Sequence, residues 1–368
     1  MKKVGILTFH RAVNYGACLQ AYALKNYIEA QGCQCDIIDY HCSAVEDFYN
    51  KIFLRDDSIK TKIKKIITWP IQKKRNEIFK DFIESKLLNG NQTDEYTRCD
   101  ISKANELYDL FIVGSDQVWS PFCTGGDLTY FLDFVNAPHK RNSYAACVGV
   151  ASDDFLKSKA VLNNLLQFNN ISVREECAQK KLNAIIFNQA GKRISLDVDP
   201  TLLLDTSKWN EVAGNGKKEH YIFVYSLSMP DEVVKFAKRL AKEQHEKIIF
   251  CTLDNLFTLR NRNDTVNVSP EEFLGYIKDA DYVITNSFHG TVFSIIFRKN
   301  FYVIKNKNPN HDNSRMVNIL SLLGVENRLI QGDCMPNTLE DIDYSCVEHK
   351  LTTMRDSSRE YICKMLLE

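Results

Sequence analysis

A short polar stretch in the second half of the sequence carries the residue types that proton-transfer chemistry requires. Residues 286–290, Asn-Ser-Phe-His-Gly, follow the strand-like run 282–285 and precede an apolar helix expected from Thr291. A histidine exchanges protons near neutral pH, and a helix N-terminus presents N–H groups to an anion. The stretch therefore indicates an anionic ligand beside His289, with a histidine hydrogen-bonded to neighbouring backbone as the structural alternative. The residues expected to face the ligand are Ser287, His289, Gly290 and Thr291.

The first half of the sequence offers polar residues at two further strand ends. The strand-like run 4–9 leads into the polar turn 10–16, and the run 108–113 leads into Gly114-Ser115-Asp116-Gln117-Val118-Trp119. Asp116 or His10 could accept a proton from a hydroxyl group, although helix caps and an ordinary turn would use the same residue types. The candidates for contact with a hydroxylated ligand are His10, Asn14, Gly16, Gln20, Asp116, Gln117 and Trp119.

Two arginines could bind the anion. Arg174 follows the strand-like run 170–173, and a guanidinium at a strand end can clamp a phosphate or carboxylate through two hydrogen bonds. The alternative for Arg174 is an ion pair with its neighbours Glu175 and Glu176. Arg315 lies in the polar segment 311–315, which we expect to be a loop after the last strand.

These residues need parallel strands to bring them together, and the sequence predicts such a framework. Strand and helix patterns alternate in both halves, which indicates an α/β fold with parallel sheets. The first βαβ unit lacks a GxGxxG dinucleotide motif. We expect a linker at 208–218, which contains Gly214 and Gly216, and a helix that Ser269 caps ahead of Pro270. The predicted domains are 1–207, 208–340 and a helix within 341–368 that packs back across the junction.

Composition limits the classes of partner and site. The 47 basic and 47 acidic residues cancel, which argues against bulk binding of nucleic acid. The cysteines are scattered, without a CxxC pair or a signal peptide, so we expect reduced thiols in the cytoplasm. Apolar runs fall short of the roughly 20 residues that a membrane-spanning helix needs. The histidines show no metal-binding spacing, so we expect no metal and no cofactor.

A basic segment interrupts the first predicted domain. Residues 51–86 are expected to form a helical insertion, and within 60–75 lysines alternate with isoleucines and Trp69. This composition suits a helix on an anionic membrane surface. An ordinary solvated helix face is the alternative.

Several of these motifs together resemble the polysaccharide pyruvyl transferase family. The resemblance covers most of the chain and rests on the order and spacing of five motifs rather than on any one of them. The motifs are Asn14-Tyr15-Gly16-Ala17-Cys18-Leu19-Gln20, Gly114-Ser115-Asp116-Gln117-Val118-Trp119, Ile171-Ser172-Val173-Arg174-Glu175-Glu176, Asp199-Pro200-Thr201 and Asn286-Ser287-Phe288-His289-Gly290-Thr291.

The resemblance implies a fold and a reaction. It implies two Rossmann-like domains facing a cleft, as in GT-B glycosyltransferases, with the acceptor on the first domain and the donor on the second. It also implies transfer of the enolpyruvyl group of phosphoenolpyruvate to a sugar diol of a cell-surface glycan, as a cyclic ketal, with release of phosphate. The family's Arg-Leu-His triplet at the phosphoenolpyruvate site falls on residues 287–289, so His289 is the expected acid. Ser287 stands where the arginine would, and Arg315 is a candidate to replace that charge.

Two other functions fit the same framework. A GT-B glycosyltransferase would use a nucleotide sugar, and a non-catalytic relative would only bind glycans. The expected partners of the enzyme are phosphoenolpyruvate, a glycan or lipid-linked oligosaccharide, and the inner face of the membrane through residues 60–75.

Overall fold

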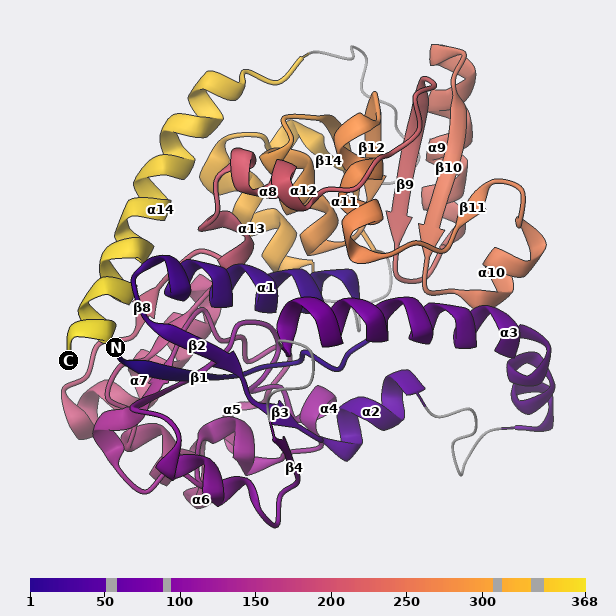
Figure 1. Cartoon of the computed structure of the whole chain (residues 1–368). Coiled ribbons are helices and arrows are strands. Elements are labelled where there is room, and N and C mark those ends of the chain that lie inside the picture. The colour runs from indigo at the N-terminus through magenta and orange to yellow at the C-terminus, as the bar shows by residue number, and fades with distance from the viewer. Residues whose placement is uncertain (51–57, 89–93, 307–312, 332–340) are drawn as a thin grey trace. The chain divides into compact units, whose positions relative to one another are not determined.

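The computed structural model describes residues 1–50, 58–88, 94–306, 313–331 and 341–368 (Figure 1). Its contacts divide the chain into two compact units. Unit 1 comprises Met1–Lys51, Lys80–Leu204 and Thr353–Glu368, and unit 2 comprises Ile52–Phe79 and Asp205–Thr352. Each unit therefore combines segments that are distant in the sequence.

Unit 1 is built on a parallel sheet with the strand order β2-β1-β5-β6. Its central strands consist mostly of aliphatic and aromatic residues that are buried on both faces, as expected for a sheet covered by helices. Single bridges from Ala146 to Asp116 and Val173 continue the parallel arrangement towards β7. The strands are β1 Lys3–Leu7, β2 Gln34–Ile37, β3 Asp39–Tyr40, β4 Glu95–Tyr96, β5 Leu110–Val113, β6 Arg141–Ser143, β7 Ser172–Val173 and β8 Ser195–Leu196.

The helices of unit 1 begin with α1, which Asn14 caps through hydrogen bonds from the N–H groups of Gly16 and Ala17. The α-helices are α1 Tyr15–Ala30, α2 Ser43–Asn50, α4 Pro121–Thr124, α5 Asp153–Lys157, α6 Lys159–Leu166 and α7 Glu176–Ala190. The shorter segments are the π-helix η1 Ile83–Leu87 and the 3₁₀ turns η2 Ile101–Glu106, η3 Leu128–Phe131, η4 Pro138–Lys140 and η5 Pro200–Leu202.

Unit 2 contains a six-stranded parallel sheet with the strand order β11-β10-β9-β12-β13-β14. Counted from β9, this is the 3-2-1-4-5-6 order of the Rossmann fold, whose direction of winding reverses between β9 and β12. The strands are β9 Tyr221–Ser226, β10 Lys247–Thr252, β11 Thr265–Val266, β12 Tyr282–Thr285, β13 Asn300–Ile304 and β14 Leu329–Ile330.

The helices of unit 2 show clear sequence signals at their ends. Ser269 and Glu272 form the reciprocal capping box of α11, and α13 ends at Leu323 before Gly324. The helices are α3 Ile59–Phe82, α8 Thr206–Val212, α9 Asp231–Gln244, α10 Asn255–Arg260, α11 Pro270–Asp279, α12 Phe288–Ile296, α13 Ser314–Leu323 and the 3₁₀ turn η6 Glu326–Arg328. The last residues of α3 belong to unit 1.

The C-terminal helix α14, Tyr344–Leu367, contributes residues to both units. In unit 1, the Arg355 Nε donates to the carbonyl oxygen of Leu202 at 2.6 Å. The Ser358 hydroxyl accepts the backbone N–H of Val198 at 3.0 Å. The backbone groups of Val198 and Leu202 therefore pair with side chains that lie more than 150 positions later in the sequence.

The structure confirms the α/β class and corrects several expectations. The expected linker 208–218 begins within α8, because Trp209 is buried and packs edge-on against Phe293 with ring centroids 4.9 Å apart. The basic insertion, expected in the first domain, belongs to unit 2 through residue 79. Residues 51–57 of that insertion and residues 311–312 of the expected loop lie outside the described ranges. Among the described residues, no helix has the length and apolar character that crossing a membrane requires.

Candidate active site

The reversal of winding in unit 2 brings two polar residues together at the carboxyl edge of its sheet. Ser226 ends β9 and Asn286 follows β12, and the Ser226 hydroxyl donates to the Asn286 Oδ1 at 2.7 Å. Ligands of open parallel sheets bind at this position, outside the carboxyl ends of the strands. We therefore expect a ligand site at the edge of the sheet that carries Asn286.

A pocket of about 200 Å³ lies at this edge. Lys305 contributes a positive charge and Glu232 a negative charge to its lining, while two asparagines offer amide groups. This mixture suits a ligand that carries an anionic group together with hydroxyl or N–H groups. The lining residues are Pro230, Glu232, Val233, Asn286, Ile304, Lys305 and Asn306.

His289 lies in the first turn of α12, beside the same strand end. Ser287 caps this helix, since its hydroxyl accepts the backbone N–H of Gly290 at 3.5 Å. The hydroxyl of Thr285 in turn accepts the N–H of Ser287 at 3.0 Å, which fixes the turn. The residue His289 is 7% exposed, and its ring meets the Phe288 ring edge-on. These contacts hold the imidazole at the ligand edge of the sheet with a small exposed surface.

Packing explains the two residues after His289. A Cβ at Gly290 would lie 2.3 Å from the Thr285 Oγ1 and 3.0 Å from the Tyr225 ring. Glycine is thus required for the close approach of α12 to β9 and β12. The Thr291 hydroxyl is buried and donates to the Ser287 carbonyl oxygen at 3.0 Å. The packing of Gly290 and Thr291 against Thr285 and Ser287 gives no support to a direct contact with an anionic ligand. That contact stays a prediction.

Arg315 lies in α13 and not in a loop as expected. It occupies the first turn of that helix and is half-buried. Its role in replacing the charge missing at Ser287 stays a prediction. Arg174 belongs to unit 1 and His289 to unit 2, so their convergence on one ligand is likewise still a prediction.

In unit 1, His10 forms part of a buried ion cluster after β1. The His10 Nε2 lies 2.8 Å from the Asp39 Oδ1, and Arg11 binds both oxygens of Asp39 at 2.6 and 2.7 Å. Burial would raise the pKa of Asp39, but the hydrogen bonds from His10 and Arg11 outweigh burial and lower it to about 2. Asp39 therefore remains a carboxylate that orients His10.

Gln20 connects the ends of β1 and β5, where the winding of the unit 1 sheet reverses. Its amide nitrogen donates to the Thr8 Oγ1 at 2.8 Å, and its amide oxygen accepts the N–H of Ser115 at 3.0 Å. Gln20 is completely buried. Asn14 is engaged as the cap of α1, and Gly16 is one of the residues that it caps. These hydrogen bonds fix the ends of β1 and β5 and the start of α1. A direct contact of Asn14, Gly16 or Gln20 with an acceptor stays a prediction.

Asp116 and Gln117 are the partly exposed residues of the β5 loop. Asp116 has a positive φ of 69°, a conformation that costs energy for a residue other than glycine. Gly114 before it has a φ of 119°, and a Cβ there would lie 2.2 Å from the Tyr144 carbonyl oxygen. Held backbone strain of this kind is found at functional sites, which favours Asp116 as the functional carboxylate of unit 1.

Arg174 binds carboxylates in the structure. Its guanidinium donates to Asp199 at 2.6 Å, to Glu175 at 3.0 Å and to Asp116 at 3.2 Å. Burial opposes the charge of Arg174, but Cys147, Glu175, Asp199 and Asp116 more than offset burial and raise its pKa well above the usual value. The arginine is therefore placed to orient Asp116, and its role as a phosphate clamp stays a prediction.

Trp119 belongs to the core of unit 1. It has no exposed surface, stacks on Phe131 with ring centroids 5.7 Å apart, and donates its indole N–H to the Tyr130 carbonyl oxygen at 2.9 Å. Because the Trp119 side chain is completely buried, the structure gives no support to the predicted contact with an acceptor. Trp119 instead supports the loop that carries Asp116.

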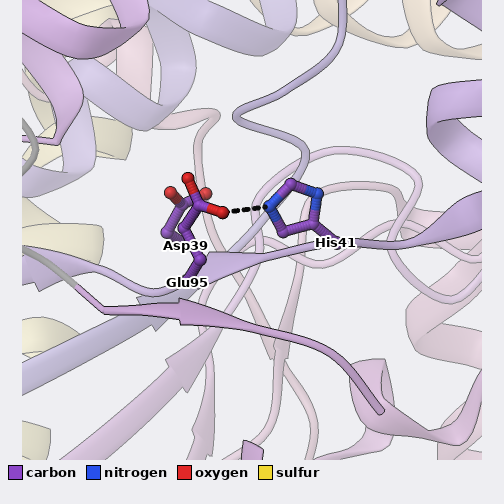
Figure 2. Close-up of side chains that lie close together, drawn as sticks. All are labelled: Asp39, His41 and Glu95. Carbon is purple, nitrogen blue, oxygen red and sulfur yellow. Dashed lines mark ion pairs between the residues drawn. The ribbon is translucent and has the colours of Figure 1, made fainter.

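Asp39, His41 and Glu95 form a cluster with metal-ligand chemistry that the sequence did not suggest (Figure 2). Their ligand atoms lie within 4.8 Å of one another, and the His41 Nε2 lies 3.4 Å from the Glu95 Oε2. Arg11 already binds both oxygens of Asp39 and lies 3.7 Å from Glu95. A metal ion would have to compete with this guanidinium, so we interpret the cluster as an ion-pair network.

Sequence reasoning gave no role to the two aspartates that orient the candidate residues, although Asp199 opens one of the five motifs. Asp39 and Asp199 each bind an arginine and are almost completely buried. A signal was present for Asp39, because an acid within the apolar run 35–40 must have a partner if it is buried. The partners themselves could not be read from the sequence.

Comparison with known proteins gives one match to a family and several distant structural likenesses. A model of the family described as polysaccharide pyruvyl transferase matches residues 14–308. No curated protein gives a significant match. A UDP-GlcNAc 2-epimerase of Methanocaldococcus jannaschii in complex with UDP-GlcNAc and UDP is 15% identical, with a TM-score of 0.49 over 100% of this chain and 99% of that chain. The ADP-heptose lps heptosyltransferase II of E. coli is 11% identical, with a TM-score of 0.37 over 97% and 99%. These two likenesses are too distant to carry an argument.

Proposed function

The chain belongs to the polysaccharide pyruvyl transferase family, and from this premise we propose that it transfers the enolpyruvyl group of phosphoenolpyruvate to a sugar diol. The product is a cyclic pyruvate ketal on a glycan, and inorganic phosphate is released. The observation that carries the proposal is the position of His289. It lies in the first turn of α12, at the edge of a Rossmann-type sheet where ligands bind.

The proposed reaction begins with protonation of the donor. His289 gives its proton to the methylene carbon of phosphoenolpyruvate, which becomes a methyl group and leaves an oxocarbenium-like centre at the adjacent carbon. One sugar hydroxyl attacks this centre, and a second hydroxyl replaces phosphate to close the ketal. One hydroxyl proton is taken up by a base and returned to the imidazole, and the other leaves with the phosphate as hydrogen phosphate, so that the imidazole and the base return to their starting states.

Unit 1 supplies the candidate bases. Asp116 is partly exposed and oriented by Arg174, and His10 is buried against Asp39. The exposure of Asp116 favours it as the group that meets the acceptor. Ser287, Lys305 and Arg315 of unit 2 are the polar and charged residues that we propose for the donor phosphate and carboxylate.

The test is a comparison of two histidine variants of unit 2. Wild-type protein is incubated with phosphoenolpyruvate and a panel of galactose- and mannose-containing acceptors, and phosphate release is measured together with the ketal methyl signal in NMR spectra. We expect His289→Ala to lose about 10²–10⁴-fold in rate, the usual contribution of a general acid. His220→Ala is the matched control, because His220 is exposed and pairs only with the surface carboxylate Asp281 among its described contacts.

Two results would speak against the proposal. The first is an absence of ketal on every acceptor together with an absence of any thermal shift by phosphoenolpyruvate. The second is unchanged ketal formation by His289→Ala, which would remove the acid role from this residue.

A glycosyltransferase reaction is the second candidate, and the unit 2 sheet favours it. Its strand order is that of nucleotide-binding folds, and the pocket of about 200 Å³ lies beside the reversal of winding. A thermal shift by a nucleoside diphosphate, without one by phosphoenolpyruvate, would establish this alternative. A glycan-binding protein without chemistry is the third reading, motivated by Ser287, which caps α12 and carries no positive charge.

We propose that the reaction takes place in the cytoplasm, with a glycan or lipid-linked oligosaccharide as acceptor and without a metal or redox cofactor. The absence of disulfide bonds among the described cysteines supports a reducing compartment. The proposed chemistry moves protons and a phosphate but no electrons, so that a redox cofactor has no role in it.

A further inference from the structure

An unusual row of exposed isoleucines runs along the first half of α3. Ile59, Ile63, Ile66 and Ile67 are 78%, 51%, 59% and 56% exposed. Their spacing of four, three and one residues places them on one face of the helix. Burying these side chains would be favourable, and the described part of unit 2 does not bury them.

The part of α3 after Pro70 is attached to unit 2 through Arg75. Arg75 is 1% exposed and donates to the carbonyl oxygens of Thr252 and Leu253 at 2.9 and 3.1 Å. The same guanidinium donates to the side chains of Asn267 and Asn255 at 2.9 and 2.8 Å. Pro70 interrupts α3 between the isoleucine row and Arg75. Arg75 therefore anchors the part of the helix after Pro70, while the isoleucines before it remain exposed.

The charged residues between Ile59 and Asn76 are all basic, and Asp56 and Asp57 precede this stretch. No aspartate or glutamate occurs from Ile59 to Asn76. The exposed lysines of this stretch are Lys60, Lys62, Lys64, Lys73 and Lys74. A second copy of the same face would meet it lysine against lysine, which disfavours pairing between copies. An anionic surface satisfies both the lysines and the isoleucines.

We propose that α3 docks the protein on the surface of an anionic lipid bilayer, with the isoleucine row at the boundary between headgroups and acyl chains and the lysines among the lipid phosphates. The proposal does not depend on the chemistry proposed for His289. It narrows the expected contact from residues 60–75 as a whole to four isoleucines and the lysines beside them.

The full chain is tested by sedimentation with vesicles of phosphatidylcholine alone and of phosphatidylcholine mixed with phosphatidylglycerol. We expect binding to the anionic vesicles that weakens as salt is added, because salt screens the lysines. The double variant Ile63→Ser/Ile66→Ser should lose at least about tenfold in affinity for the anionic vesicles. Lys60→Glu/Lys64→Glu should also lose binding.

A control helix separates a local effect from a change in net charge. Lys235 and Lys238 are exposed on α9 of the same unit, so Lys235→Glu/Lys238→Glu alters the net charge equally and should leave binding nearly unchanged. All of these positions are exposed, and unchanged thermal unfolding would show that the variants fold.

Three results would overturn the proposal. They are equal binding to neutral and anionic vesicles, equal losses in the α3 and α9 lysine variants, and a dimer in sedimentation velocity that the isoleucine variant abolishes. The last result would assign the isoleucine row to contact between copies of the chain.

Discussion

Replacement of Arg174 by methionine tests whether this arginine serves the fold or the ligand. In the structure its guanidinium connects three carboxylates of unit 1. If this network is its role, the variant loses stability in unit 1. If it is instead a phosphate clamp, the variant loses affinity for an anion.

The burial of the network sets the size of the effect. The side chains of Arg174 and Asp199 are 2% and 0% exposed, and the two are 2.6 Å apart. Removing one member of a buried ion pair leaves an uncompensated charge and typically costs about 3–5 kcal/mol. Arg174→Lys keeps the charge but cannot reach three carboxylates with one ammonium, so we expect an intermediate loss.

A surface pair provides the matched control. The guanidinium of Arg298 lies 3.7 Å from Glu348, and these side chains are 59% and 38% exposed. Such pairs contribute about 0–1 kcal/mol, and we expect Arg298→Met to fall in that range.

Hydrogen exchange measured by mass spectrometry resolves the two units. Peptides that contain β5 or β7 should lose protection in Arg174→Met by an amount corresponding to about 3–5 kcal/mol, while peptides that contain β9 serve as an internal reference. A loss below about 1 kcal/mol in β5, combined with a lost thermal shift by phosphoenolpyruvate, would refute the structural role.

Three further variants test local features of the structure. Gly290→Ala should destabilise unit 2 by about 1–3 kcal/mol through overpacking against Thr285, measured by urea unfolding; an unchanged midpoint would contradict the close approach. Asp39→Asn should cost about 1–2 kcal/mol at neutral pH. Because folding lowers the pKa of Asp39 from 3.8 to about 2, its stabilisation is complete above pH 4 and is lost as the pH falls through about 2, so the wild-type and variant unfolding curves should converge in acid. Arg75→Met should cost about 2–3 kcal/mol by leaving buried carbonyl groups unsatisfied, and should speed tryptic cleavage at the lysines of α3; equal cleavage rates would contradict the anchor.

Regular elements with strong local signals were predictable from the sequence. The strand β12 has the predicted bounds, and Ser269 caps α11 as predicted. In each case the apolar periodicity and the end signals agree. The α/β class followed from the same alternation.

Features that depend on contacts distant in the sequence were not predictable in this way. The helix α8 covers the first part of the expected linker, because Trp209 is buried, while Gly214 and Gly216 follow the helix. Residues 52–79 group with unit 2, since Arg75 finds its acceptors near positions 252 and 267. The orientation of the candidate site residues depends in the same way on Asp39, which lies outside the motifs, and on Asp199, whose partner Arg174 the motif Asp199-Pro200-Thr201 does not identify.

The interleaved composition of unit 1 has a consequence for its synthesis. Residues 1–204 leave the ribosome long before Arg355 and Ser358, which satisfy the backbone groups of Leu202 and Val198. These backbone groups of unit 1 therefore remain hydrated until all of unit 2 has been translated. A chain interrupted before Thr353 would contain every residue of unit 2 and an incomplete unit 1, which is the kind of species that chaperones and proteases retain.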